Sequence, residues 1–168
     1  HNGIMPSRKS DIVTVSNSDP KYSTTKAISG NPYIVNGPGE YEIGQYYITG
    51  IATPLTESTS EDPKINVIYT IRAEGLVICQ LGGINQKLTS GQLDQLRQAN
   101  ILLAPIAKSS SLAHETLQEI ISAIQPRILI PLEYIEENDD GTPTGLDTFL
   151  TNTGTTDALN AEANLVFT

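Results

Sequence analysis

The chain has 168 residues, of which 38% are hydrophobic and 17% are charged. This length and composition are typical of one folded domain with its own core, and we expect a single domain over residues 1–168. The 10 basic and 19 acidic residues give a net charge of -9. Nucleic acid and anionic membrane surfaces would repel such a chain, so we expect neither as a partner.

The first half is predicted to be rich in strands. "DIVTVS" (11–16) is a β-branched run that passes directly into the polar loop "NSDPKYS" (17–23). Gly44-Gln45 separates two apolar runs and predicts a hairpin turn. The polar stretch 54–64 predicts a solvated loop, and residues 65–83 predict two strands that meet at a turn over 73–75.

The second half alternates predicted helices with short apolar strands. Thr89 and Gln92 form a capping-box pattern that opens one helix. Residues 111–126 place four apolar side chains on one helical stripe, after serines that we expect to cap the helix; these four are Leu117, Ile120, Ile121 and Ile124. The predicted strands are 100–107, 127–134 and the closing 164–168, and a last short helix is expected over 144–154.

A β meander followed by β-α-β-α-β units predicts an α/β fold in layers (α+β layers), with helices covering a sheet. Ligands in such sheets gather at the carboxyl ends of the strands. Four loops qualify as candidate sites; they span 16–23, 81–86, 105–111 and 131–138. The lone Cys79 is expected to be a buried apolar side chain. A single cysteine excludes an intrachain disulfide and a cysteine-rich zinc site, and we expect a cytoplasmic protein.

Several segments recur in the order found in one family: "NGPGEYEIGQYYITGI", "LVICQLGG", "LTSGQLDQL", "ILLAPIA" and "IQPRILIPLEY". With these segments the chain resembles the metallo-β-lactamase-fold hydrolases, in the branch that includes ascorbate-6-phosphate lactonase-like enzymes. The resemblance implies an αββα sandwich. It also implies that the opening β-hairpins of the family are missing from this chain and lie upstream or on another chain.

The resemblance further implies where a zinc site would lie. In the family a His-x-His-x-Asp-His loop follows the strand that is similar to "DIVTVS", and histidines and carboxylates from later loops complete the site. This chain departs from that pattern at every position, and no histidine falls near 54–56. The vestigial site positions are Asn17, Asp19, Lys21, Tyr22, Gly83 and Glu133. We therefore expect no zinc, no other cofactor and no catalytic residue.

Two occupants of the vestigial cavity stay open. Asp19 and Glu133, with Asn17, could offer oxygen ligands to Mg²⁺, Ca²⁺ or Mn²⁺. Alternatively, Lys21 forms an ion pair with Asp19 or Glu133 and fills the cavity, since its positive charge repels a cation.

Other chemistry-bearing residues indicate structural roles. His114 has no second histidine or cysteine beside it and is expected to be a partly exposed helix residue. Gly82-Gly83 lacks the further motif of a phosphate loop, so we expect it to serve backbone conformation. The acidic loop 133–141 lacks the ligand spacing of an EF-hand and predicts a solvated loop.

The sequence therefore predicts a degenerate metallo-β-lactamase-fold protein without zinc catalysis, acting as a binding or assembly module through a protein partner or self-association. The alternative is a metal-dependent hydrolase of the same superfamily with an altered or partner-completed site. Four tyrosines gather in the meander, where they either form an interface or pack on the sheet; they are Tyr33, Tyr41, Tyr46 and Tyr47.

Overall fold

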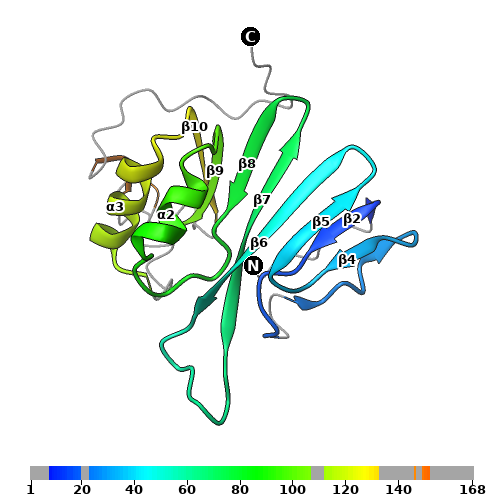
Figure 1. Ribbon diagram of the computed structural model, residues 1–168, viewed down its shortest axis with the longest axis horizontal. Coiled ribbons are helices and arrows are strands. Elements are labelled where there is room, and N and C mark those ends of the chain that lie inside the picture. The colour runs from blue at the N-terminus through cyan, green and yellow to red at the C-terminus, as the bar shows by residue number, and fades with distance from the viewer. Residues whose placement is uncertain (1–7, 20–22, 107–111, 133–145, 147–148, 152–168) are drawn as a thin grey trace, which may run out of the picture.

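The computed structural model describes residues 8–19, 23–106, 112–132, 146 and 149–151 (Figure 1). Its strands are β1 (Arg8–Lys9), β2 (Ile12–Thr14), β3 (Ile28–Ser29), β4 (Tyr33–Val35), β5 (Gly39–Ile43), β6 (Tyr46–Pro54), β7 (Ile65–Ala73), β8 (Leu76–Gln80), β9 (Ile101–Pro105) and β10 (Ile128–Leu132), and its labelled helices are α2 (Ser90–Leu96) and α3 (His114–Ile124).

The main sheet has six strands in the order β10-β9-β8-β7-β6-β5. Strands β5 to β8 form an antiparallel meander, and β8, β9 and β10 are parallel because α2 and α3 carry the chain back between them. Two small parallel pairs, β1-β3 and β2-β4, complete the strands. The predicted meander followed by β-α-β-α-β units is confirmed.

Two tight turns explain the meander. Gly44 adopts φ +60° between β5 and β6, and Glu74 and Gly75 adopt φ +49° and +80° between β7 and β8. Positive φ favours glycine, because a Cβ atom crowds the backbone in that region. Both predicted turns lie at the predicted residues.

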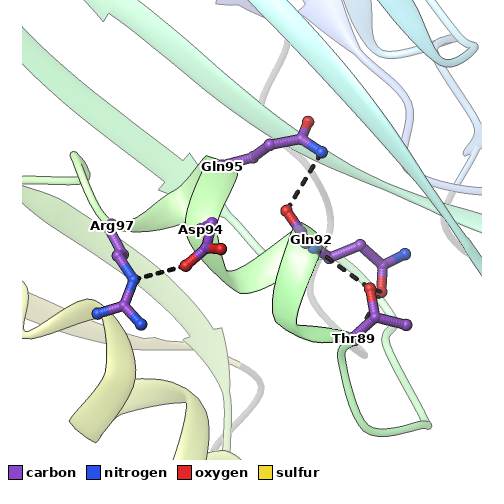
Figure 2. Close-up of polar contacts among 6 residues, drawn as sticks. Thr89, Gln92, Asp94, Gln95 and Arg97 are labelled. Atoms are coloured by element: carbon purple, nitrogen blue, oxygen red, sulfur yellow. Dashed lines mark hydrogen bonds and ion pairs between the residues drawn. The ribbon is translucent and has the colours of Figure 1, made fainter.

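Helix α2 begins with the predicted capping box. The Thr89 hydroxyl accepts a hydrogen bond from the Gln92 backbone N–H, and the Gln92 side chain accepts one from the Thr89 N–H (Figure 2). Arg97 pairs with Asp94 at 2.8 Å near the other end of the helix. The local sequence therefore fixes where this helix starts.

Helix α3 carries the predicted apolar stripe, with Leu117, Ile120 and Ile124 buried and Ile121 half-buried. The expected serine cap is wrong, because the N-cap is Ala113 and it makes no side-chain capping bond. The helix ends at Gln125, whose φ of +51° is left-handed and whose N–H donates to the Ile121 carbonyl. Packing of the stripe, rather than capping, determines this helix.

The six-stranded sheet is covered on both faces (Figure 1). One face packs against α2 and α3 in a core that includes Ile68, Leu102 and Ile120. Val35, Ile48, Val67 and Tyr69 form a second core with Ile12, so the β2-β4 pair packs there. The α/β layered fold class is confirmed.

The remaining expectations concern Cys79, the last helix and two segments outside the described residues. Cys79 is fully buried, as predicted, and burial raises the pKa of its thiol to about 12. Leu146 and residues 149–151 are helical, within the last expected helix. The expected strand 164–168 and the acidic loop 133–141 lie outside the described residues. Within the described part of the chain, no helix is long and apolar enough to cross a membrane.

Candidate functional site

The loop after β2 is tied to the main sheet. The Ser16 carbonyl accepts a hydrogen bond of 2.6 Å from the backbone N–H of Val67 on β7. Beyond it, the Asn17 side-chain oxygen accepts a bond of 2.9 Å from the Asp19 N–H, which closes a local turn. This loop is therefore held at the end of β2 where the resemblance would place the metal-binding loop.

The loop after β8 lies against the same residues. A Cβ atom added at Gly83 would lie 3.1 Å from Asn17 Nδ2, and one added at Gly82 would lie 2.6 Å from Ser16 Cβ. Gly82 also has φ +65°, so both space and backbone conformation favour glycine there. The structure thus brings Asn17 and Gly83 together, although they are far apart in the sequence.

Asn66 is fully buried at the start of β7, next to Val67, and bonds to the loop after β8. Its amide nitrogen donates to the Leu81 carbonyl at 2.9 Å and to the Thr53 hydroxyl at 3.2 Å. Its side-chain oxygen accepts from the Gly83 N–H at 2.8 Å. Every hydrogen-bonding atom of this amide is used inside the protein.

Asn85 connects the loop after β8 to the loop that follows β6. The Asn85 side-chain oxygen accepts from the Thr56 N–H at 3.1 Å, and its nitrogen donates to the Thr56 hydroxyl at 2.8 Å and to Glu57 at 3.0 Å. A backbone hydrogen bond, followed by the Asn85 amide, lowers the pKa of Glu57. The positions where the resemblance would place a histidine are thus occupied by a hydrogen-bonded loop without one.

Of the predicted site positions within the described residues, Asp19 alone carries a carboxylate and none carries an imidazole. Asn17 already accepts a hydrogen bond through its side-chain oxygen, and Gly83 has no side chain. No group of three or more His, Cys, Asp or Glu side chains that could hold a metal occurs among the residues that the structure describes. The predicted positions Lys21, Tyr22 and Glu133 lie outside those residues, and so does the Lys21 ion pair.

Sequence reasoning missed the residues that hold the loops together, which are Ser16, Asn66 and Asn85. Asn66 could have been recognised from the sequence, because it is a polar residue inside the largely apolar run "INVIYT". His114 begins α3 and lies edge-to-face with Phe149, with ring centroids 5.8 Å apart. This packing contact fits the predicted structural role of the histidine.

The four tyrosines of the meander divide into two pairs. Tyr33 and Tyr47 have 67% and 55% of their surface exposed. Tyr41 and Tyr46 pack against the second core, and the Tyr41 hydroxyl donates to the Gly37 carbonyl at 3.0 Å. Tyr41 and Tyr46 therefore pack on the sheet, as one of the two interpretations predicted, and Tyr33 and Tyr47 are exposed.

Comparisons with known proteins place the fold in a family. The profile of the β-lactamase superfamily domain matches residues 2–133. The chain belongs to this superfamily and has its metallo-β-lactamase fold. A comparison with curated proteins finds no match.

Solved structures support the same fold. A Thermotoga maritima protein of the metallo-β-lactamase superfamily, provisionally assigned as a Zn-dependent hydrolase, superposes with a TM-score of 0.70 at 22% identity, over 88% of this chain and 71% of that one. A Parabacteroides distasonis protein, provisionally assigned as a metal-dependent hydrolase, gives 0.60 at 15% identity, over 89% and 74%. Identities this low establish the fold alone.

Proposed function

We propose that this protein is a metallo-β-lactamase-fold protein without zinc catalysis that acts as a binding or assembly module. The observation that carries the proposal is the pairing of Asn17 with Gly83 at the meeting point of the loops. An amide and a glycine supply neither the imidazole nor the carboxylate that a zinc site needs. The ascorbate-6-phosphate lactonase-like branch and a cytoplasmic location are parts of this proposal.

The hydrogen bonds of the loops support the proposal further. The side-chain amides of Asn66 and Asn85 bond the loop after β8 to Thr53 and to the loop at 56–57, so these loops are held by hydrogen bonds that need no metal. Exposed Tyr33 and Tyr47 provide a surface of the type enriched at protein interfaces. Binding of a protein partner or self-association is therefore the function we assign to the scaffold.

Elemental analysis of the purified protein tests the absence of a metal. After incubation with zinc and dialysis, we expect a zinc content well below one ion per chain, and the same for magnesium, calcium and manganese. A stoichiometric metal that is lost in Asp19→Ala or Glu133→Ala would favour the alternative, a metal-dependent hydrolase with an altered or partner-completed site. Ser60→Ala, in the exposed 54–64 loop, is the control that should change nothing.

Light scattering tests the assembly part of the proposal. We expect the molar mass of the protein to rise with concentration, or to rise when it is mixed with a partner recovered from its host. A strict monomer that also recovers no partner would contradict the proposed module. This result and the metal content are independent, so each can fail alone.

A further inference from the structure

Strand β5 forms one edge of the six-stranded sheet, and among the described strands only β6 pairs with it. Ile43 and Tyr46 flank the two-residue turn of the β5-β6 hairpin, so they form a hydrogen-bonded pair. By alternation, the backbone N–H and C=O groups of Glu40 and Glu42 are directed away from β6. No backbone hydrogen bond outside the β5-β6 ladder uses these groups within the described chain. Another strand could therefore add to this edge.

The opposite edge of the sheet, β10, is less suited to pairing. The Ile128 N–H donates to the Asn100 carbonyl next to β9, at 3.0 Å. Since alternate residues of a strand bond to the same neighbour, position 131 is directed away from β9, and Pro131 has no N–H to donate there. A proline at such a position is typical of an edge that is protected from further pairing. Of the two edges, β5 is the one that can accept a strand.

The side chains of Glu40 and Glu42 lie on the face of the sheet that carries α2 and α3. Tyr41 and Ile43, which alternate with them or follow them on β5, pack against the second core on the opposite face. Both glutamates are exposed, and neither takes part in the three ion pairs found within the described residues. Arg72 shares their face but belongs to β7, two strands away. The edge strand thus presents two carboxylates in one row.

A cavity of about 640 Å³ lies on the other face, between the β2-β4 pair and the end of the β5-β6 hairpin (Figure 1). Ile12 and Tyr33 line it from the β2-β4 pair, and Ile43 and Tyr46 line it from the hairpin. These four side chains are aliphatic or aromatic, and Asp11 lies among them. Successive side chains of a strand point to opposite faces, so a strand beside β5 could direct one side chain toward the glutamates and the next into this cavity.

We propose that β5 accepts an extended segment of a partner protein as an additional antiparallel strand, with basic side chains opposite Glu40 and Glu42 and an apolar side chain in the cavity. In this kind of recognition, backbone hydrogen bonds provide affinity and pockets for alternate side chains provide specificity. Opposite charges on neighbouring strands stabilise the pairing, and like charges destabilise it. Two copies of β5 would bring four carboxylates together, so a different, basic protein is the partner. The net charge of -9 attracts such a segment over a distance.

This partner chemistry rests on the proposed binding role of the protein. It does not depend on whether the loop site holds a metal, because β5 contributes no residue to that site.

The test is an NMR titration of the ¹⁵N-labelled protein with the peptide acetyl-Leu-Arg-Val-Arg-Thr-amide. In the proposed antiparallel register its two arginines lie opposite Glu42 and Glu40, and its leucine enters the cavity. We expect amide shifts that concentrate on residues 39–46 and near Tyr33. With about 90% of the protein bound, hydrogen exchange of the Glu40 and Glu42 N–H groups should slow about tenfold, since only free protein then exchanges. Exchange of the Tyr41 N–H, already bonded to β6, should change little.

Matched peptides separate the charge from the strand pairing. Citrulline in place of both arginines keeps the shape and removes the charge, and should weaken binding about tenfold. A methyl group on the backbone nitrogen of the arginine opposite Glu42 removes the donor to the Glu42 carbonyl and should also weaken binding about tenfold. The same methyl group on the valine nitrogen, which points away from β5, should weaken binding less than about twofold.

Variants localise the binding to the edge strand. Glu40→Gln and Glu42→Gln preserve shape and should each weaken the arginine peptide about threefold, with no change for the citrulline peptide. Glu61→Gln, which replaces an exposed carboxylate in the 54–64 loop, is the matched control and should change neither.

Four results would overturn the proposal: no binding of the arginine peptide, equal binding of the arginine and citrulline peptides, equal binding of the two methylated peptides, or unchanged exchange of the Glu40 and Glu42 N–H groups at saturation. If any of these occurs while the protein still recovers a partner from its host, strand addition at β5 is wrong and the proposed binding role stands. If no partner is recovered either, both are wrong.

Discussion

The two ends of the central strands differ in how their polar groups are used. At the loop end, Asn66 bonds to the loop after β8, and Asn85 joins that loop to the loop at 56–57 through amide hydrogen bonds. At the opposite end, the exposed carboxylates of Asp11 and Glu42 take part in none of the ion pairs found within the described residues. The comparison shows that side-chain amides hold the polar groups of the loop end in hydrogen bonds, while the carboxylates of the opposite end stay exposed.

Replacement of Asn66 should produce the largest effect. Asn66→Ala removes the partners of the Leu81 carbonyl and the Gly83 N–H and leaves a void in a fully buried position. We expect the free energy of unfolding, measured by urea titration, to fall by about 3 kcal/mol. Asn85→Ala removes exposed hydrogen bonds and should cost less than about 1 kcal/mol. Equal losses in the two variants would show that Asn66 does not hold the loop end.

A glycine pair measures how tightly the loop end is packed. Gly82→Ala places a Cβ atom 2.5 Å from Asn66 Oδ1 at a residue with φ +65°, whereas Gly44→Ala, at φ +60°, meets nothing within 4 Å. Both variants incur the cost of positive φ, about 1 kcal/mol, and only Gly82→Ala adds a clash. We expect a total loss of about 2–3 kcal/mol for Gly82→Ala in the same urea assay. Similar values for the two would mean that Ser16 and Asn66 can move aside.

The sequence predicted the strands and loops better than the hydrogen bonds that hold the loops together. Thr89 and Gln92 predicted a helix start, and Gly44 and Gly75 predicted turns, because each depends on neighbouring residues only. Asn66 could be recognised as unusual in its strand, but its three partners come from separate segments. Asn17 and Gly83 also lie close together, and local sequence pattern carries no information about such a long-range contact.

The sequence was wrong about the cap of α3 and missed one long-range contact, and both have the same physical origin. Serines were expected to cap α3, but the chain starts that helix at Ala113, where burial of Leu117 and Ile120 outweighs a missing cap. The hydrogen bonds of Asn66 were not predicted, because Thr53, Asn66 and Gly83 meet only after the strands have packed. Tertiary packing decided both cases.

Tyr69 links the loop end to the β2-β4 pair and should give a moderate effect. Its buried hydroxyl lies 3.1 Å from both the Val15 and the Val35 carbonyl oxygens. Tyr69→Phe keeps the ring and removes this bond, and we expect a loss of about 1–1.5 kcal/mol in urea unfolding. Tyr47→Phe, whose hydroxyl is exposed, should cost almost nothing and serves as the control.

Alkaline pH provides a second measurement on Tyr69. Burial, and then the neighbouring Tyr41, raise the pKa of Tyr69 from 10.0 to about 12. The folded state therefore keeps this proton between pH 10 and 12 while the unfolded state loses it, so stability falls as pH rises through that window. Burial likewise raises the pKa of the Cys79 thiol from 9.0 to about 12, so this thiol would add its own pH dependence. The protein with Tyr69 and the Tyr69→Phe variant should therefore both carry Cys79→Ala. In the Cys79→Ala background, the free energy of unfolding of the Tyr69→Phe variant should fall less between pH 10 and 12 than that of the protein that keeps Tyr69. Parallel curves of unfolding free energy against pH would contradict the raised pKa of Tyr69.

The open end should tolerate changes that the loop end does not. Asp11→Asn and Glu42→Gln replace exposed side chains, and Glu42→Gln keeps an oxygen that can accept from Tyr47. We expect each to change the free energy of unfolding by less than about 0.5 kcal/mol, and the pair to be neutral or slightly stabilising because two repelling carboxylates are removed. A loss comparable to that of Tyr69→Phe would mean that these carboxylates support the fold. The contrast between the two ends would then disappear.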